Sequence, residues 1–234
     1  MFWDDEKKTT AFQVSDDVVD VMYSITCKSL PLDHAKEFTD SIMRSLNWIA
    51  DEELAGIHLV HGAESGNGWV RPENPETQLL HLSRRAKMML RVPKSRIEDA
   101  KKLTGQVLDI DGYSMEVGNA SVKLFSSLST QFSRYIVIPA DIDIQDETAF
   151  MEYAAREIQT LGISVKKMLC GKRHFFLMAD SRKLHTRSLM LAELEHEEAV
   201  LLQQKGVGGH KTRGCGLFIP HKGIEAVRKV DSGQ

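Results

Sequence analysis

The order of strand-like and helix-like segments restricts the fold of this 234-residue chain more than any other feature. Apolar residues alternate from Val19 to Cys27, as in a half-buried strand, and then recur at helical spacing from Ala35 to Ile49. Two short strands follow at residues 57–60 and 87–92, and a second helix at residues 95–103. A hairpin then forms around a turn at Asp111-Gly112. This order, strand-helix-strand-strand-helix-strand with one added hairpin, predicts a ferredoxin-like domain.

The second half of the chain repeats the order. A strand at residues 132–138 precedes a helix that Asp146 caps and Gly162 ends. Next come strands at 165–170 and 174–179 joined by a turn at Gly171-Lys172, a helix at 196–205 and a last strand at 214–219. Residues 188–194 fit either an extra strand or an early start of the last helix. Two βαββαβ units predict an α+β protein with two tandem ferredoxin-like, RRM-like domains, at residues 1–130 and 131–234.

A glycine-rich loop, residues 206–216, lies between the last predicted helix and the last strand. Two Gly-x-Gly pairs bracket a basic insert, as Gly206-Val207-Gly208, then His210, Lys211 and Arg213, then Gly214-Cys215-Gly216. Glycine permits positive φ, and clustered backbone N–H groups cradle phosphates. A Walker loop needs glycine directly before Lys-Ser/Thr, but His210 stands there, and a dinucleotide fingerprint opens a helix after a strand. The loop therefore predicts a polyanion site of another kind and disfavours a nucleotide-binding enzyme.

The helix, glycine loop and strand resemble the C-terminal end of the CRISPR repeat-processing endoribonucleases, which cut long CRISPR transcripts into guide RNAs. Upstream blocks are similar to one branch of this repeat-associated RAMP superfamily, the MYXAN type first named for myxobacteria, at residues 24–34, 57–63, 65–69 and 80–85. The resemblance implies cleavage without metal or cofactor, in which the 2′-hydroxyl attacks the scissile phosphate and leaves a 2′,3′-cyclic phosphate and a 5′-hydroxyl. It also implies that the protein keeps the product and serves as an effector-complex subunit.

Charge and cysteine usage restrict the remaining function classes. The formal net charge is −3, so a nucleic-acid surface depends on how the charges are distributed and not on their sum. The three cysteines have no paired spacing, which argues against a zinc site or a disulfide framework and favours a reducing compartment. No apolar run is long enough to span a membrane. We expect a cytoplasmic protein without a metal site, a cofactor or a membrane partner.

Metal-free RNA cleavage needs a base, an acid and a cation, and histidine suits the first two roles. His34 is predicted in the first turn of a helix capped by Asp33, where the helix dipole favours the neutral imidazole that a base requires. His61 adjoins a glycine-rich segment that can approach RNA, and Ser65 in that segment can orient a phosphate or the 2′-hydroxyl. His58 and His61 lie three apart on a predicted strand, which points them to opposite faces.

The expected RNA-binding residues lie in three places. They are Arg84 and Arg85, Lys172 and Arg173, and the glycine-loop residues Gly206, Gly208, His210, Lys211, Arg213 and Gly214. Arg84 and Arg85 are expected on opposite sides of an extended segment, so that at most one faces RNA. An aromatic octamer of the RNP type is absent from the sequence, which argues against generic stacking on single strands.

Two functions fit this sequence. The first is the endoribonuclease, with CRISPR repeat RNA, guide RNA and other effector subunits as partners. The second is a catalytically inactive scaffold that binds an RNA hairpin in a CRISPR effector complex or a CRISPR-guided transposition complex. The sequence alone does not separate them, nor does it tell which histidine is the base and which the acid.

Overall fold

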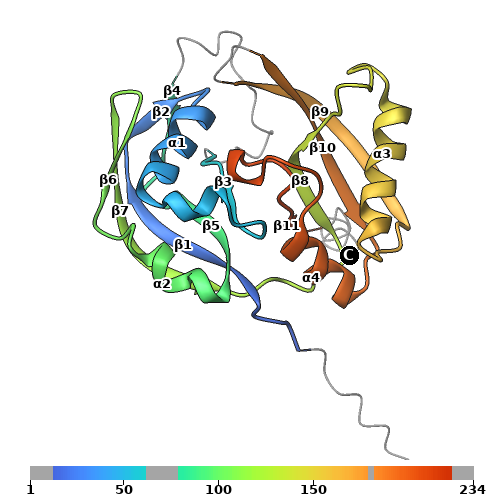
Figure 1. The fold of residues 1–234 in the computed structure, drawn as a ribbon, viewed down its shortest axis with the longest axis horizontal. Coiled ribbons are helices and arrows are strands. Elements are labelled where there is room, and N and C mark those ends of the chain that lie inside the picture. Colours follow the sequence, from blue (N-terminus) through green and yellow to red (C-terminus); the bar gives the residue numbers. More distant parts are fainter. Residues whose placement is uncertain (1–12, 62–78, 179–181, 223–234) are drawn as a thin grey trace, which may run out of the picture.

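Two antiparallel sheets, one from each half of the chain, form the framework of the protein (Figure 1). The structure is a computed structural model and describes residues 13–61, 79–178 and 182–222. The first domain contains, in chain order, β1 (Val18–Thr26), β2 (Ser29–Pro31), α1 (Ala35–Ser45), η1 (Asn47–Ala50), β3 (Gly56–His58), β4 (Leu79–His81), β5 (Lys87–Pro93), η2 (Lys94–Arg96), α2 (Ile97–Lys101), β6 (Val107–Ile110) and β7 (Tyr113–Lys123). The second contains β8 (Gln131–Val137), α3 (Glu147–Thr160), β9 (Lys167–Leu177), β10 (Lys183–Ala192), α4 (His196–Lys205), η3 (Lys211–Arg213) and β11 (Ile219–Pro220).

The strand orders confirm the predicted tandem ferredoxin-like fold. The first sheet has the order β3-β5-β1-β7-β6, and the second has the order β11-β8-β10-β9. When the strands of each βαββαβ unit are counted from one to four, both sheets read 4-1-3-2 from one edge. The additional strand β6 joins β7 through Asp111 and Gly112, whose φ values of 53° and 80° suit the predicted two-residue hairpin turn. A separate two-stranded sheet pairs β2 with β4.

Helix boundaries follow local sequence signals. The Asp146 carboxylate accepts a hydrogen bond from the Ala149 N–H at 2.9 Å, which confirms the predicted cap of α3. The predicted α4 has the bounds that the structure shows. At α1 the prediction is wrong by one residue, because His34 and not Asp33 is the N-cap, and His34 makes no side-chain cap hydrogen bond.

The prediction of two separate strands at residues 165–170 and 174–179 is wrong, because both belong mostly to the single strand β9. Gly171-Lys172 is not a turn but a β-bulge inside β9, where the pairing with β10 shifts between Arg187 and Leu189. A Cβ at residue 171 would lie 2.6 Å from the Ser188 Oγ, so a side chain here would require Ser188 to move. Residues 188–194 belong mostly to β10, and the segment after Gly214 is a strand only at Ile219–Pro220.

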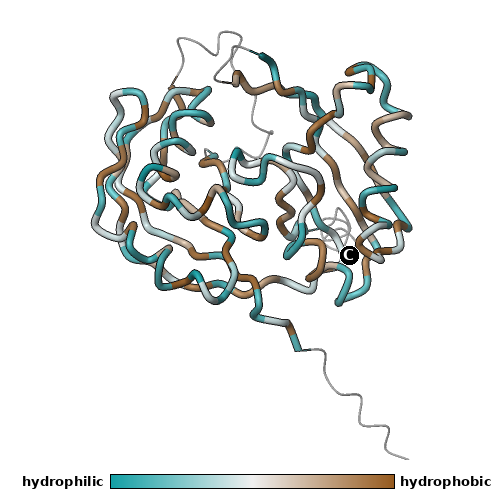
Figure 2. The backbone as a smooth tube through the Cα atoms, viewed as in Figure 1, coloured by the Kyte–Doolittle hydropathy of each residue, from teal (hydrophilic) through white to brown (hydrophobic). Residues whose placement is uncertain are grey.

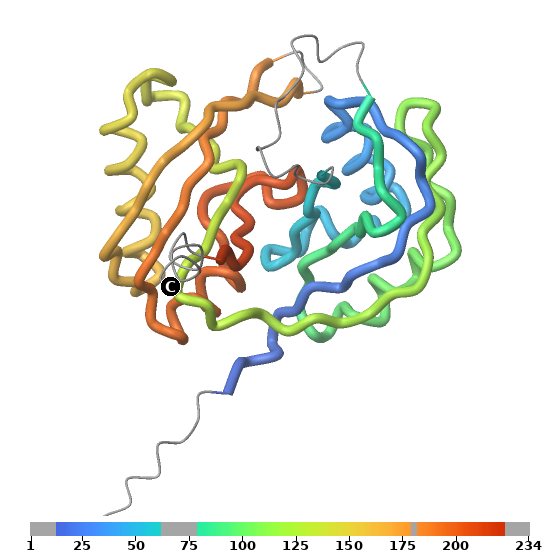
Figure 3. The backbone as a smooth tube through the Cα atoms, turned by 180° about the vertical axis from the view of Figure 1, so that it is seen from behind, coloured from blue at the N-terminus to red at the C-terminus, as the bar shows by residue number. Residues whose placement is uncertain are grey.

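Apolar contacts bury one face of each sheet and also join the two domains. Figure 2 shows how apolar positions alternate with polar ones along the strands. Phe176 and Cys215 of the second domain belong to the buried apolar cluster of the first, and Tyr135, Val137 and Leu184 pack against it. The glycine loop, drawn in orange-red, lies at this junction beside β3 and α1 (Figures 1 and 3). The domains are therefore packed together at the loop that the sequence marks out.

Candidate functional site

The two ends of the glycine loop cross at a distance that excludes any side chain. A Cβ on Gly206 would lie 2.5 Å from the Gly216 oxygen, and a Cβ on Gly216 would lie 2.2 Å from the Val207 oxygen. The Val207 N–H donates to the Gly216 oxygen at 3.0 Å, and the Gly216 N–H donates to the Tyr135 oxygen at 2.7 Å. These two glycines thus close the loop and attach it to β8, so their role in this structure is packing against the protein itself.

The middle of the loop faces outward. Gly208 has a φ of +73°, and a Cβ on Gly209 would have open space around it. His210 is exposed and has a left-handed backbone with a φ of 62°. The backbone N–H groups of residues 208–212 donate to no acceptor within the part of the chain that the structure describes. Consecutive free N–H groups in such a turn form a concave site for an anionic oxygen.

The two cations of the loop point into the protein. The Lys211 ammonium donates to the backbone oxygens of Lys205 and Glu53, each at 2.9 Å. The Lys205 carbonyl is one of those that the end of α4 leaves without a helical partner, so Lys211 caps this helix. Burial lowers the pKa of Lys211.

Arg213 and Gly214 attach the end of the loop to the first domain. Arg213 donates a hydrogen bond to Thr39 of α1, and a Cβ on Gly214 would lie 2.6 Å from the Cγ of Leu59. RNA contact by Lys211 and Arg213 stays a prediction, and it would require these internal bonds to be exchanged.

His34 is buried at the start of α1, with only 5% of its surface exposed. Its Nδ1 lies 3.0 Å from the Pro31 carbonyl oxygen, which can only accept, so Nδ1 carries the hydrogen in the neutral ring. The Nε2 lone pair is therefore free, and this atom is buried without a hydrogen-bond partner among the described residues. Burial lowers the pKa of His34 and outweighs the Pro31 carbonyl and the Asp33 charge, which act in the opposite direction. The expected neutral ring thus has burial as its main cause.

His61 lies in the wall of a cavity of about 360 Å³ between the domains. Burial among protein atoms is the main cause that lowers the pKa of His61 to about 3, and the positive charge of Arg134 lowers it further. His61 as a whole residue is nevertheless exposed to solvent at the border of this cavity. The prediction that His58 and His61 point to opposite faces is wrong: β3 ends at His58, and both rings line this cavity.

The other predicted residues lie apart from these histidines. Arg84 and Arg85 are both exposed in the turn before β5, and not on opposite sides of an extended segment. Lys172 and Arg173 are exposed on β9 at its bulge. Ser65 is outside the described residues.

A group of rings beside His61 was not predicted from the sequence. The Tyr135 ring lies 6.0 Å from His61, 5.2 Å from His174 and 4.9 Å from Phe176, measured between ring centroids. Tyr135 comes from β8, and His174 and Phe176 come from β9. A β-bulge within β9 changes which side chains share a face, so strand alternation alone could not place His174 beside Tyr135.

Known proteins share this tandem ferredoxin-like fold. A family model described as "Cas6 Crispr" matches residues 19–223, and the chain therefore belongs to the Cas6 CRISPR family. A curated relative, the CRISPR-associated endonuclease Cas6 of Myxococcus xanthus strain DK1622, is 26% identical over 202 residues, which cover 86% of this chain and 81% of the relative. This result confirms the resemblance found in the sequence.

Solved structures agree on the fold. A protein described as "CRISPR associated protein Cas6" superposes with a TM-score of 0.60 at 8% identity, covering 88% of this chain and all of the other. A RAMP protein described as binding different RNA substrates gives a TM-score of 0.58 at 15% identity, covering 86% of this chain and 98% of the other. Within the described residues, no helix has the length and apolar character needed to cross a membrane.

Proposed function

We propose that this protein is an endoribonuclease that cuts CRISPR precursor transcripts within the repeat and keeps the guide RNA as a subunit of an effector complex. Its membership of the Cas6 family and its likeness to a relative described as a CRISPR-associated endonuclease support this function. The observation that carries it is a pair of histidines with lowered pKa values: His61 lines the same cavity as Gly214 of the glycine loop, and His34 is the N-cap of the helix that Arg213 contacts. A cytoplasmic location stays a prediction.

In the proposed mechanism the N–H groups of residues 208–212 bind the phosphate at the cut. The His34 Nε2 accepts the proton of the upstream 2′-hydroxyl. The 2′-oxygen forms a bond to phosphorus as the bond from phosphorus to the 5′-oxygen breaks. His61, whose pKa rises when an anionic phosphate enters, protonates the leaving oxygen. The products are a 2′,3′-cyclic phosphate and a 5′-hydroxyl, and Ser65 orients the reacting groups.

The experiment that tests the function uses purified protein and its repeat RNA in EDTA. We expect cleavage at one position, a cyclic phosphate at the upstream product and retention of the guide fragment on the protein in a native gel. RNA with a 2′-deoxy sugar just upstream of the cut should bind without being cut, because the nucleophile is missing. Failure of the unmodified RNA to be cut, with or without added divalent metal, would contradict the endoribonuclease.

The second function is a scaffold that binds an RNA hairpin without cutting it. The burial of His34 favours it, because a ring that is 5% exposed must be uncovered before RNA can reach it. In the same experiment the scaffold would bind both RNAs with equal affinity and leave both intact.

Lys172 and Arg173 are proposed to contact RNA phosphates, because both side chains are exposed on β9. Replacing both with alanine should weaken repeat-RNA binding and reduce the slope of log K against log salt by about 0.7–0.9 for each phosphate left without its cation. Filter binding over a range of salt concentrations measures this slope. The control is Lys101→Ala with Lys102→Ala, which removes the same charge from the last residue of α2 and from its C-cap, where the two lysines pair with Glu98 and Asp99. Equal slopes for the two double variants would remove Lys172 and Arg173 from the RNA interface.

A further inference from the structure

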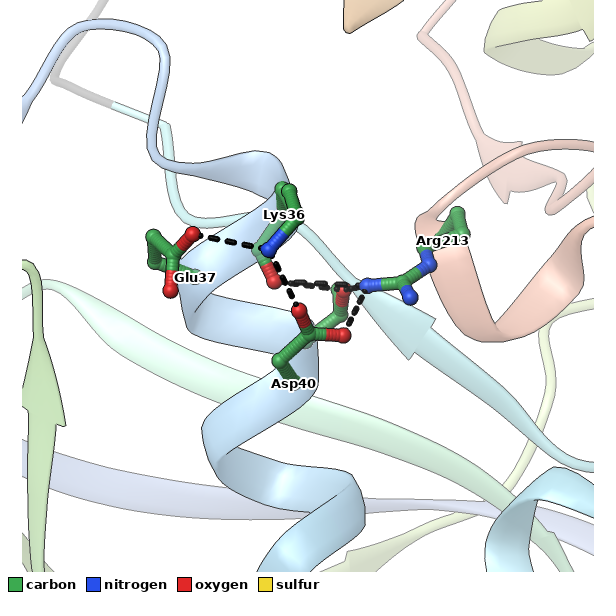
Figure 4. Close-up of polar contacts among 5 residues, drawn as sticks. Lys36, Glu37, Asp40 and Arg213 are labelled. Carbon is green, nitrogen blue, oxygen red and sulfur yellow. Dashed lines mark hydrogen bonds and ion pairs between the residues drawn. The ribbon is translucent and has the colours of Figure 1, made fainter. Parts of the chain in front are cut away.

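Arg213 joins the glycine loop to α1, the helix whose N-cap is His34 (Figure 4). One guanidinium nitrogen, Nη1, makes all of these contacts. It lies 2.6 Å from the Thr39 Oγ1, 3.3 Å from the Lys36 carbonyl oxygen and 2.5 Å from the Asp40 Oδ1. The three acceptors belong to a single turn of α1. These contacts join the two domains, because α1 belongs to the first domain and Arg213 to the second.

Asp40 is held in place from both sides. Lys36, one helical turn before it, approaches its other oxygen at 2.9 Å and also contacts Glu37 at 2.9 Å. Burial alone would raise the pKa of Asp40, but hydrogen bonds from Lys36 and Arg213 outweigh burial and lower it. The carboxylate is therefore charged at neutral pH. Because the Arg213 and Asp40 side chains are 25% and 22% exposed, solvent screens the pair only in part.

The turn that Arg213 contacts also fixes the position of His34. The His34 carbonyl accepts the first hydrogen bond of α1 from the Phe38 N–H at 2.9 Å, so the imidazole lies at the end of the same rigid turn. On its other side, Arg213 is one residue from the N–H groups of residues 208–212, and its own N–H donates to the His210 carbonyl at 2.8 Å. Arg213 thus connects the two parts of the proposed site that must face each other across the scissile phosphate.

We propose that Arg213 is a positioning residue, which sets the distance between the His34 imidazole and the glycine loop through Thr39 and Asp40 and does not bind the RNA phosphate itself. This inference rests on the proposed cleavage reaction. A misplacement of a reacting group by about 1 Å lowers a rate by as much as about 10²-fold. The guanidinium suits the task because it is planar and always charged, whereas a lysine ammonium lies at the end of a flexible stem.

The experiment compares Arg213→Ala with Arg44→Ala, a control on the exposed side of the same helix. We expect Arg213→Ala to slow single-turnover cleavage about 10–100-fold, to leave the salt slope of RNA binding unchanged and to change the Kd by less than about threefold. Arg44→Ala should match wild type. Arg213→Lys should recover only part of the rate. In a double-mutant cycle with His34→Ala, the second substitution should add little, because both act on the same proton transfer.

Two results would overturn the proposal. One is wild-type cleavage by a folded Arg213→Ala variant. The other is weaker binding with a salt slope reduced by about 0.7–0.9, which would make Arg213 a phosphate ligand. Wild-type protein that binds RNA without cutting would refute the reaction and not the positioning. In that case the ¹⁵N chemical shifts of the His34 ring, measured without RNA, decide the matter. They should change in Arg213→Ala and not in Arg44→Ala, and identical spectra would also overturn the proposal.

Discussion

His34→Ala is expected to slow single-turnover cleavage of the repeat RNA by about 10²–10⁴-fold, the usual loss when a general base is removed. The neutral ring has its hydrogen on Nδ1, 3.0 Å from the Pro31 carbonyl, and leaves Nε2 to accept a proton. RNA affinity should stay near the wild-type value, because it depends on many phosphate contacts spread over the protein. Rates with enzyme in excess, measured beside the equilibrium Kd, separate the two effects.

His196→Ala is a matched control for this substitution. His196 also begins a helix, and its Nδ1 lies 2.9 Å from the Ser127 carbonyl oxygen, but the side chain is exposed. Normal cleavage by His34→Ala would transfer the role of base to His61. Loss of both folding and binding in His34→Ala, with His196→Ala unaffected, would make His34 a structural residue.

Local signals in the sequence were sufficient to predict most of the fold. The turn at Asp111-Gly112, the cap at Asp146 and the α4 segment depend on interactions within a few residues of each other, which a sequence pattern records directly. Gly171 was misread because glycine serves both turns and bulges, and the difference depends on a contact with Ser188 in another strand.

The candidate site was harder to predict, because its side chains have partners far away in the sequence. A basic residue in a glycine loop can bind a ligand or another part of the chain, and the residue type is the same in both cases. Lys211 and Arg213 find acceptors at Glu53 and Thr39, 158 and 174 positions away. Burial of His34 also comes from tertiary packing, so a helix-dipole argument gave the right direction of its pKa shift with the wrong main cause.

Arg91→Leu is expected to have the largest effect on stability, because Arg91 holds both domains together from a position that is 1% exposed. Its Nε and Nη2 donate to the Asp20 carboxylate at 2.9 and 3.1 Å. Its Nη1 donates at 2.6 Å to the Gln203 carbonyl in the last turn of α4, and its Nη2 donates at 3.0 Å to that of Phe218. Arg91 thus pairs a buried carboxylate of the first domain and caps a helix of the second.

Removing one partner of a buried ion pair leaves the other without compensation, at a cost of about 3–5 kcal/mol. Urea unfolding of Arg91→Leu at pH 7 should show a loss of that size. Arg96→Leu is the control, since Arg96 also pairs with acids and lies over an aromatic ring, Trp48, but is 40% exposed and should cost about 0–1 kcal/mol. A similar loss in both variants would show that Arg91 is no more important to stability than a surface arginine.

The pH dependence of the same measurement tests the cause of the loss. Burial raises the pKa of Asp20, but the Arg91 charge, the Arg91 hydrogen bonds and the nearby His58 ring outweigh it and hold the pKa well below its usual range. The stabilisation from ionised Asp20 is therefore fully present above the pKa of about 4 that an unfolded aspartate has, and it is lost as the pH falls further. The difference between wild type and Arg91→Leu should be largest at neutral pH and should narrow below about pH 4. Adding Asp20→Asn to Arg91→Leu should restore part of the stability, because no buried charge is then left unpaired. A difference that stayed constant with pH and was not restored in the double variant would assign the loss to packing alone.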